Sequence, residues 1–459
     1  FGPAVEKLRA KGVTDALRRY LSDPSRPFLG ICLGLQLLFE GSEECPGTRG
    51  LGVFRGTVGK FDASKASVPH MGWNRAAVKT QEGLFDAGDR FYFVHSYRVS
   101  LASSEDARNY ACGVCTYAGD DFVAALQRGN QTAVQFHPEK SAQTGLALLG
   151  RFLRRSFGEG LSSSVPPSEP SSNNKNNNTD SDALPSLKKR GLARRVVCAL
   201  DVRENDAGDL VVTKGDAYDV REKTDVRAVR NLGKPVELAA RYYEEGADEI
   251  AVLNICAFKG EPVADLPLLD VLRRASERCF VPLTIGGGVR EYVTKDGVTV
   301  DPVDVAAAYF RAGADKVAIG SDAVRAAERY YANDARGDGA SSIERIAEVY
   351  GSQAVVVSVD PRRAWLGADD ADVKDRVAVD HSTARGPNGE TRCWYRCTVS
   401  GGRKDTNLDA VRLCQAVEAL GAGELMLNCI DTDGKGTGFE LDLVKLVKSS
   451  VSIPVIASS

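Results

Sequence analysis

The residue whose surroundings best suit chemistry is Cys32. It lies in GICLGLQLLFE, where the stretch 27–34 is expected to be a strand that enters a helix and contains Gly30-x-Cys32-x-Gly34. The glycines allow a sharp strand-to-helix turn, the sulfur analogue of the G-x-S-x-G nucleophile elbow. A helix amino terminus favours the thiolate over the thiol. The pattern predicts a nucleophilic cysteine; the alternative is a structural cysteine in the turn.

A nucleophilic cysteine needs a base, and QFHPEKS offers His137 with Glu139 two residues on. At a strand end, residues i and i+2 point the same way, so Glu139 can orient the imidazole. The chain has only 4 His. We therefore predict a catalytic triad in which Cys32 attacks, His137 transfers the proton and Glu139 orients His137.

Two carboxylates in the second half of the chain also stand at expected strand ends. Asp201 closes RVVCALD and Asp360 closes AVVVSVD. If these are the first and fifth strands of a barrel, the two carboxylates face each other across its mouth. Such a pair suits general acid–base chemistry. A single Asp at a strand end is more often a helix cap, but the symmetric pair favours catalysis.

Glycines follow two further expected strands, as Gly286-Gly287-Gly288 and as Gly320-Ser321. Backbone N–H groups in such turns, together with a helix amino terminus, bind phosphate. The internal repeat predicts a second phosphate site that starts at 457–459. Two opposed sites imply a long substrate with a phosphate at each end.

The elements that position these residues alternate along the second segment. Seven short apolar runs lie between 195 and 458, with amphipathic stretches such as PVELAARYYEEGA between several of them. Continuous apolar runs indicate strands covered on both faces. The alternation predicts an α/β fold, a (β/α)8 TIM barrel lacking strand 8. GADEIAVLNI and GAGELMLNCI repeat one pattern, which indicates two related half-barrels.

Composition divides the chain into three parts. Residues 160–190 are rich in Ser, Asn and Pro and contain few apolar residues, so we expect a flexible linker. The predicted domains are a partial α/β domain at 1–159 and a partial barrel at 191–459. The chain begins at Phe1 and stops on an expected strand, so we expect truncation at both ends, with any targeting segment upstream.

The overall composition excludes several classes of protein. The 459 residues carry a net charge of −3 and are 43% hydrophobic, which argues against nucleic-acid binding and against disorder. No apolar run approaches ~18 residues, so no membrane span is expected. The 11 Cys do not form a small secreted framework, which indicates a reducing compartment. Cys112-x-x-Cys115 allows a zinc interpretation, but no second close pair accompanies it; we expect no metal and no cofactor.

GICLGLQ and HPE together resemble the class I glutamine amidotransferases. The resemblance implies that Cys32 attacks the side-chain amide of glutamine and that ammonia is released. It also implies that Gln36 and the strand end His95-Ser96-Tyr97 hold the glutamine. VPHMGWN at 68–74 resembles a segment that faces the partner synthase in the histidine branch. The family's oxyanion glycine loop would lie upstream of Phe1.

The second segment resembles the cyclase of the imidazole glycerol phosphate synthase family. The matching stretches are ARRVVCALDVRENDAGDLVVTKGD, GGGVR, GADKVAIGSDAV, SVDPRR and LNCIDTDGKGTGFE. Their fusion to a glutaminase resembles the bifunctional form of fungi, plants and algae. The resemblance implies that ammonia passes through the barrel and reacts with phosphoribulosyl-formimino aminoimidazole carboxamide ribonucleotide. The products would be imidazole glycerol phosphate, aminoimidazole carboxamide ribonucleotide and glutamate.

The same resemblance assigns roles within the barrel. It makes Asp201 and Asp360 the acid–base pair and Lys214 a mobile substrate contact. Charged residues at strand starts would gate the ammonia; the alternative is a salt-bridge ring that closes the barrel floor. These gate residues are Arg195, Glu249 and Lys316. The residues implied for substrate or phosphate contact are Asn254, Gln353, Asn428, Asp433, Gly287, Gly288, Gly320, Ser321 and Ser458.

Two other interpretations stay open. A histidine-pathway sugar isomerase shares the two strand-end Asp residues but needs no ammonia, and the chain could be an inactive fragment of the synthase. The expected partners are glutamine, a bis-phosphorylated ribonucleotide and an intramolecular glutaminase–cyclase interface, with no nucleic acid and no membrane. The expected compartment is the plastid stroma or the cytoplasm.

Overall fold

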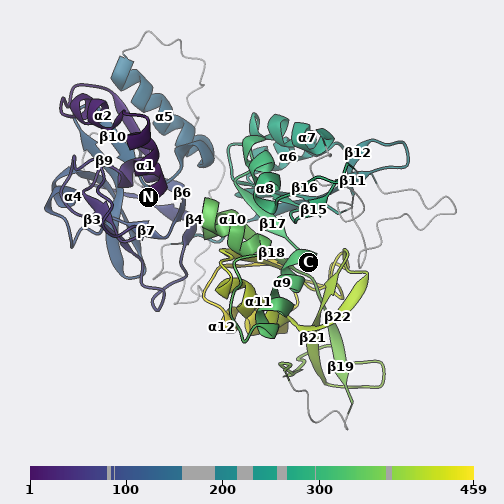
Figure 1. The fold of residues 1–459 in the computed structure, drawn as a ribbon. Coiled ribbons are helices and arrows are strands. Elements are labelled where there is room, and N and C mark those ends of the chain that lie inside the picture. The colour runs from purple at the N-terminus through teal and green to yellow at the C-terminus, as the bar shows by residue number, and fades with distance from the viewer. Residues whose placement is uncertain are drawn as a thin grey trace, which may run out of the picture. The chain divides into compact units, whose positions relative to one another are not determined.

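The computed structural model describes residues 1–79, 84–86, 88–157, 192–213, 231–255, 266–294, 296–367 and 375–459. It divides into two compact units, Phe1–Arg195 and Val196–Ser459 (Figure 1). Both units mix helices and strands, which confirms the predicted α/β class. The expected linker at 160–190 lies outside the described residues. No helix in the described ranges is long and apolar enough to cross a membrane.

A five-stranded sheet in the order β1-β10-β9-β8-β5 organises the first unit. β1 and β10 run parallel, with Ile31 opposite Val134. The next residues, Cys32 and Gln135, therefore leave the sheet side by side. Smaller sheets are β2-β3-β7 and β4-β6. The elements of this unit are α1 (Gly2–Ala10), α2 (Thr14–Leu21), β1 (Phe28–Ile31), α3 (Leu33–Gln36), β2 (Gly41–Ser42), β3 (Thr57–Lys60), β4 (His70–Arg75), β5 (Ala77–Val78), β6 (Arg90–His95), β7 (Tyr97–Arg98), α4 (Glu105–Tyr110), β8 (Ala111–Tyr117), β9 (Asp120–Arg128), β10 (Gln131–Val134), the 3-10 helix η1 (Pro138–Lys140) and α5 (Ala142–Phe157).

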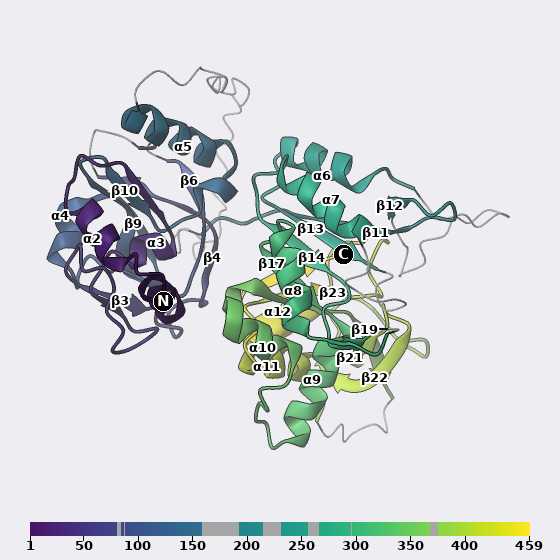
Figure 2. The same cartoon turned by 45° about the horizontal axis from the view of Figure 1, so that its top comes forward.

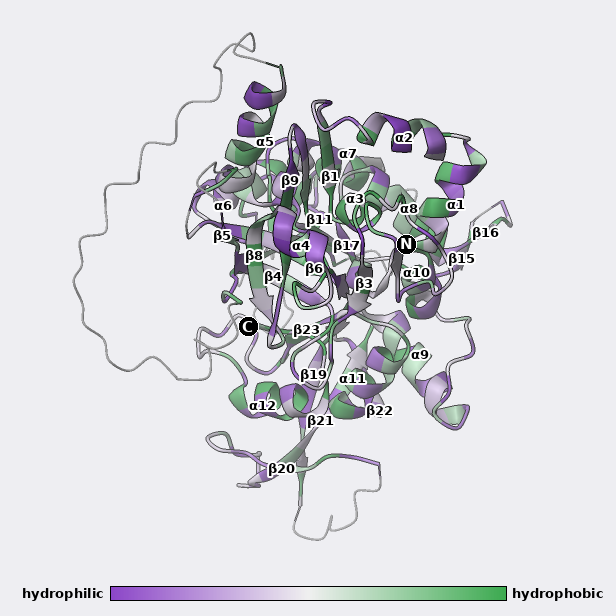
Figure 3. Cartoon of the chain, turned by 90° about the vertical axis from the view of Figure 1, so that its left-hand side faces the viewer, coloured by the Kyte–Doolittle hydropathy of each residue, from purple (hydrophilic) through white to green (hydrophobic). Residues whose placement is uncertain are grey.

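Aromatic side chains form much of the core of this unit. Phe91 stacks on Phe136 with ring centroids 3.9 Å apart. α5 buries Leu148 and Phe152 and has basic residues in its last turn, as expected of a helix with one apolar face. Figure 3 shows the corresponding mixture of hydrophobic and hydrophilic residues along α1 and α5.

In the described residues of the second unit, parallel strands follow one another in the order β11-β13-β14-β17-β18-β23-β24. β12 pairs antiparallel with β11 as the arm of a hairpin. Figure 2 shows α6, α7 and α8 outside these strands. The elements are β11 (Val197–Glu204), β12 (Leu210–Thr213), α6 (Pro235–Glu244), β13 (Glu249–Asn254), α7 (Leu266–Ser276), β14 (Leu283–Gly286), β15 (Tyr292–Val293), β16 (Thr299–Val300), α8 (Pro302–Arg311), β17 (Lys316–Ile319), α9 (Ser321–Ala332), α10 (Ser342–Tyr350), the 3-10 helix η4 (Ser352–Ala354), β18 (Val355–Val359), β19 (Pro361–Leu366), β20 (Val379–Asp380), β21 (Arg392–Val399), β22 (Lys404–Asp409), α11 (Ala410–Ala419), β23 (Glu424–Asn428), α12 (Leu441–Ser450) and β24 (Val455–Ser458).

Local sequence fixes several of the helix starts. Asp301 caps α8 by accepting a hydrogen bond from the N–H of Val303, and Asp409 caps α11 in the same way. Ser341 and Glu344 form a capping box at α10. Each cap satisfies amide groups that have no partner within the helix.

An antiparallel sheet of β19, β20, β21 and β22 is inserted between β18 and α11. Figure 1 shows β19 and β21 extending from the parallel strands. The turn between β21 and β22 contacts the first residue of α9, because the N–H of Ser400 donates to Ser321 Oγ at 2.8 Å. The insertion therefore meets the barrel at the start of α9.

Candidate active sites

Cys32 occupies a sharp turn between β1 and α3. Its φ of 48° lies in a region that non-glycine residues rarely adopt, and such strain is typical of a nucleophile elbow. A Cβ on Gly30 would lie 3.0 Å from the backbone of Gly34, a tight contact, so the close approach of strand and helix favours glycine there. The local geometry thus presents the thiol at a strand end, as predicted.

His137 and Glu139 lie together beside this turn. His137 Nδ1 is 2.7 Å from Glu139 Oε1. Burial acts to lower the pKa of His137, but the Cys32 thiolate and the Glu139 carboxylate outweigh it and raise the pKa to about 10. Burial likewise acts to raise the pKa of Glu139, yet its hydrogen bond to His137 holds it below the ordinary value. The arrangement therefore favours the protonated imidazolium form of His137.

The residues expected to hold glutamine are engaged with one another. Gln36 Nε2 donates to the carbonyl of Tyr97 at 3.0 Å, and His95 Nδ1 is 2.8 Å from the same oxygen. The carbonyl of Ser96 accepts from the N–H of Phe61. Burial lowers the pKa of His95 to about 3, so the ring is neutral. Their contact with glutamine stays a prediction.

Cys112 and Cys115, the pair that allowed a zinc interpretation, lie on β8 as free, buried thiols. Burial raises the pKa of both thiols. A zinc ligand must be the thiolate, so these surroundings work against a metal site.

A cavity of about 450 Å³ opens at the carboxyl ends of the parallel strands. Gln353, predicted as a substrate contact, lies elsewhere, because it precedes β18 and donates to the carbonyl of Tyr350 at the amino end of that strand. Lys214 lies outside the described residues. The predicted residues that line the cavity are Asp201, Asp360, Asn254, Gly287, Gly288, Gly320, Ser321, Asn428, Asp433 and Ser458.

Three carboxylates shape the electrostatics of this cavity. Burial, and then the charges of Asp433 and Asp360, raise the pKa of Asp201 to about 7. Asn428 Nδ2 donates to Asp433 Oδ1 at 3.3 Å, and Ser358 Oγ donates to Asp360 at 3.4 Å. Asp201 can therefore hold a proton at neutral pH.

The opposite ends of the strands carry a buried charged layer of Glu249, Lys316 and Glu424. Lys316 Nζ lies 2.5 Å from Glu249 and 2.9 Å from Glu424. Sequence reasoning missed Glu424, although it occupies the place of Glu249 in the repeat GADEI and GAGEL.

Arg195 was expected to start the first strand, but β11 begins two residues later, at Val197, and Arg195 ends the first unit.

An apolar layer of Ala251, Ala318, Val356 and Met426 packs between the charged layer and the cavity. Ala251, Ala318 and Met426 each stand two residues after a member of the charged layer. Alternate residues of a strand share a face, so both layers point into the barrel. Two positions further along β18 and β23, Ser358 and Asn428 line the cavity.

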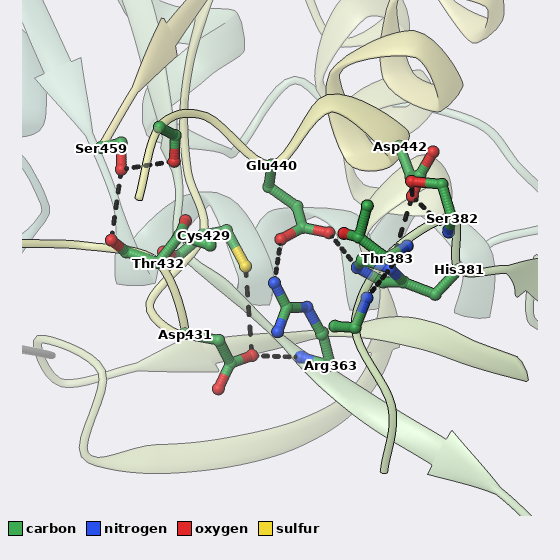
Figure 4. A network of polar contacts seen from close by, with 12 residues as sticks. Arg363, His381, Ser382, Thr383, Cys429, Asp431, Thr432, Glu440, Asp442 and Ser459 are labelled. Carbon is green, nitrogen blue, oxygen red and sulfur yellow. Dashed lines mark hydrogen bonds and ion pairs between the residues drawn. The ribbon is translucent and has the colours of Figure 1, made fainter. Parts of the chain in front are cut away.

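Buried polar contacts hold the loop that carries Asp433, between β23 and α12 (Figure 4). The backbone N–H of Arg363 donates to Asp431 at 2.7 Å, and its guanidinium pairs with Glu440 at the other end of the loop. Glu440 also accepts from Tyr395 Oη at 2.8 Å. The inserted sheet thus fixes both ends of a cavity loop, a role that no local motif signalled.

Among the described residues, His381, Glu440 and Asp442 could bring three metal-ligating atoms together. His381 Nδ1 accepts the N–H groups of Thr383 and Ala384, so Nε2 carries the hydrogen and donates to Glu440 at 2.5 Å. Both ring nitrogens of His381 are thus already hydrogen-bonded. The guanidinium of Arg363 already supplies a positive charge to Glu440. These residues act as part of the loop network.

Comparison with known proteins covers both units. Residues 195–459 match the family model "Histidine biosynthesis protein", and residues 2–155 match "Glutamine amidotransferase class-I". The imidazole glycerol phosphate synthase hisHF, chloroplastic, of Arabidopsis thaliana is 51% identical over 462 residues, which are 100% of this chain and 73% of the relative. The hisHF synthases of Schizosaccharomyces pombe and Emericella nidulans are each 47% identical over 100% of this chain and over 82% and 81% of their own lengths.

Proposed function

The chain belongs to the imidazole glycerol phosphate synthase hisHF family, and we propose how its two units divide the reaction. It is an enzyme of histidine biosynthesis with a glutamine amidotransferase unit and a cyclase unit, so glutamine and a nucleotide are its substrates. Since the matches include the first unit, they favour the synthase over the isomerase interpretation. In our proposal the nucleotide is the bis-phosphorylated phosphoribulosyl-formimino aminoimidazole carboxamide ribonucleotide.

In the first unit, His137 takes the proton from Cys32 and the sulfur attacks the amide carbon of glutamine. The C–N bond then breaks, and ammonia leaves with the proton that His137 returns. Water hydrolyses the thioester to glutamate and regenerates the thiol. The observation that supports this best is the strained φ of Cys32 beside the 2.7 Å His137–Glu139 contact.

In the second unit, we assign the general acid to Asp201 and the general base to Asp360. The raised pKa of Asp201, about 7, supports its role as the acid, because a carboxyl group that is still protonated near neutral pH can donate a proton. The glycine turns at Gly287 and Gly320 are the proposed phosphate contacts on one side of the cavity. Ser458 is the proposed contact on the other.

We propose that ammonia enters the barrel at the charged layer and reaches the cavity through the apolar layer. An apolar passage favours neutral ammonia over ammonium, because a charge is costly to desolvate. Neutral ammonia is the form with a free lone pair for attack. Arg195, Glu249 and Lys316 remain the proposed gate, with Glu424 added from the geometry.

We keep the domain limits 1–159, 160–190 and 191–459 as part of the proposal. For the compartment we propose the plastid stroma or the cytoplasm. The word "chloroplastic" in the name of the Arabidopsis relative supports the first.

The test compares Cys32→Ala with Asp201→Asn. We expect Cys32→Ala to lose glutamine hydrolysis by at least about 10³-fold but to form product from added ammonia. Asp201→Asn should hydrolyse glutamine but lose product formation from either nitrogen source. Each retained activity shows that the unsubstituted unit is intact, and a wild-type circular dichroism spectrum and unfolding transition show that the substituted unit has folded.

Glutamine hydrolysis by Cys32→Ala would exclude the proposed nucleophile, and full product formation by Asp201→Asn would exclude the proposed acid. An unsubstituted chain that is folded but lacks both activities would support the inactive-fragment interpretation.

A further inference from the structure

Gln135 contacts the nucleophile but belongs to neither the triad nor the predicted glutamine site. Gln135 follows β10 directly and is fully buried, with 0% of its surface exposed. Its Nε2 atom lies 3.5 Å from Cys32 Sγ. The parallel pairing of β1 and β10 brings these two residues together although 103 positions separate them.

The direction of this contact follows from its neighbours. The carbonyl oxygen of Tyr97 can only accept, so the atom of Gln36 that lies 3.0 Å from it must be the amide nitrogen. The same nitrogen is 3.3 Å from the amide oxygen of Gln135. Gln135 therefore turns its oxygen to Gln36 and its N–H group to the sulfur.

A second chain of hydrogen bonds, through His95, also ends on the carbonyl of Tyr97. His95 Nδ1, 2.8 Å from Tyr97 O, must carry a hydrogen, so His95 Nε2 accepts from His70 Nδ1 at 3.1 Å. His70 Nε2 then accepts from Asn74 Nδ2 at 3.2 Å. Burial lowers the pKa of both rings, so both stay neutral and the donors keep their direction.

The five polar residues of this network are each at most 5% exposed; they are Gln36, His70, Asn74, His95 and Gln135. Buried polar groups that are fully bonded to one another hold a single arrangement, because any rotation leaves a polar atom unsatisfied. The carbonyl of Tyr97 thus receives donors from two sides, which supports a fixed orientation of Gln36 and, through it, of Gln135.

We propose that Gln135 is a positioning residue of the glutaminase reaction, whose amide N–H, aimed by Gln36 and the Tyr97 carbonyl, stabilises the thiolate of Cys32. The inference rests on the proposed role of Cys32 as nucleophile. A hydrogen-bond donor to the sulfur favours the charged form and fixes its direction of attack. Gln36 and His95 then act through Gln135, whichever contacts they also make with glutamine.

The test measures thiolate reactivity independently of turnover. Iodoacetamide alkylates the thiolate, and mass spectrometry of the Cys32 peptide gives its rate at each pH. In Gln135→Glu an anion that cannot donate replaces the amide, and in Gln135→Met the donor is removed without a charge. We expect the midpoint pH of alkylation to rise by at least about one unit in Gln135→Glu and by less in Gln135→Met. At a pH below the midpoint, a rise of one unit lowers the thiolate fraction about tenfold. Glutaminase kcat should fall at least about tenfold in both, with KM for glutamine changed less than about threefold.

Gln131 provides the matched control, since it is the first residue of β10, is also buried, and donates to the carbonyls of Leu21 and Asp23. The same two substitutions there should leave the alkylation midpoint unchanged. The circular dichroism spectrum and the thermal unfolding transition report folding of the first unit, and ammonia-dependent product formation shows that the second unit is unaffected. If Gln135→Glu does not fold, Gln135→Met decides.

A folded Gln135→Met chain with the wild-type alkylation profile would overturn the inference, and so would an equal shift in the Gln131 variants. If instead Cys32→Ala still hydrolyses glutamine, the proposed function fails first, whatever the Gln135 variants show.

Discussion

At the residue scale, burial pushes both His137 and Asp201 toward their neutral forms, but the two groups respond differently. Next to His137 lie a thiolate and a carboxylate, and they reverse the effect of burial and raise the pKa to about 10. Next to Asp201 lie two more carboxylates, which add to the effect of burial and raise the pKa to about 7. The neighbouring charges thus make one site an ion pair and the other a proton donor.

A first prediction concerns the charge of Asp433, which helps to raise the pKa of Asp201. In Asp433→Asn that charge is absent, so the pKa of Asp201 falls. If Asp201 is the acid, the rate declines as pH rises through its pKa, and the alkaline limb of the profile moves to lower pH.

The measurement is ammonia-dependent product formation against pH at constant free ammonia. The rate itself will also fall, because Asn428 loses its carboxylate acceptor. Asp380→Asn, which removes an exposed carboxylate, should leave the limb in place. If the alkaline limb of the pH–rate profile of Asp433→Asn is unchanged or moves to higher pH, the assignment of Asp201 as the acid is contradicted.

Sequence could predict those site residues whose partners are close in the chain. His137 and Glu139 are two positions apart, and Cys32 stands between two glycines in a turn, so spacing alone indicated their chemistry. Gln135 stands in the same short run as His137, but its partner is distant and only the pairing of β1 with β10 reveals it. Gln353 was named as a substrate contact by resemblance, although it precedes the apolar run that forms β18 and so lies at the end of that strand opposite the cavity.

At the element scale, the parallel strands were predictable because each is a continuous apolar run between helical stretches. β19 to β22 were not assigned as a sheet, although they fix the loop that carries Asp433. Antiparallel hairpins with one exposed face have mixed composition, so they leave a weaker signal. The charged layer was predicted in part, since Glu249 and Lys316 were recognised as residues that begin strands. Glu424 begins β23 in the same way and was missed, although the repeat marks its position.

A second prediction concerns the charged layer, in which one ammonium is shared by two buried carboxylates. Lys316→Met removes that ammonium and leaves Glu249 and Glu424 charged in the barrel interior. Because breaking a buried pair costs about 3–5 kcal/mol, the free energy of unfolding of this unit should fall by about that amount. Urea denaturation followed by tryptophan fluorescence measures it, since Trp365 and Trp394 lie in this unit.

The triple variant Lys316→Met, Glu249→Gln and Glu424→Gln separates charge from packing. Without the two carboxylates, most of the lost stability should return. A cost below about 1 kcal/mol for Lys316→Met alone would show that the carboxylates do not depend on the shared ammonium. A triple variant no more stable than Lys316→Met would attribute the loss to packing.

At the scale of the whole molecule, one chain carries both the source of ammonia and the reaction that consumes it. Ammonia released to solvent at neutral pH is mostly ammonium, which has no free lone pair, and it also diffuses away. Two sites on one chain avoid this loss if the product of one reaches the other directly, because tethering raises its effective concentration.

The last prediction tests that transfer by mixing two defective chains. Asp201→Asn releases ammonia but cannot use it, and Cys32→Ala can use ammonia but cannot release it. An equimolar mixture supplied with glutamine at pH 7 should form product at less than about a tenth of the wild-type rate, because ammonia must cross the solvent between chains. Added ammonium salt or a higher pH should restore the rate, since both increase free ammonia. A mixture that reaches half the wild-type rate at pH 7, independent of dilution, would mean that ammonia equilibrates with solvent. The apolar layer of the barrel would then be packing and not a passage.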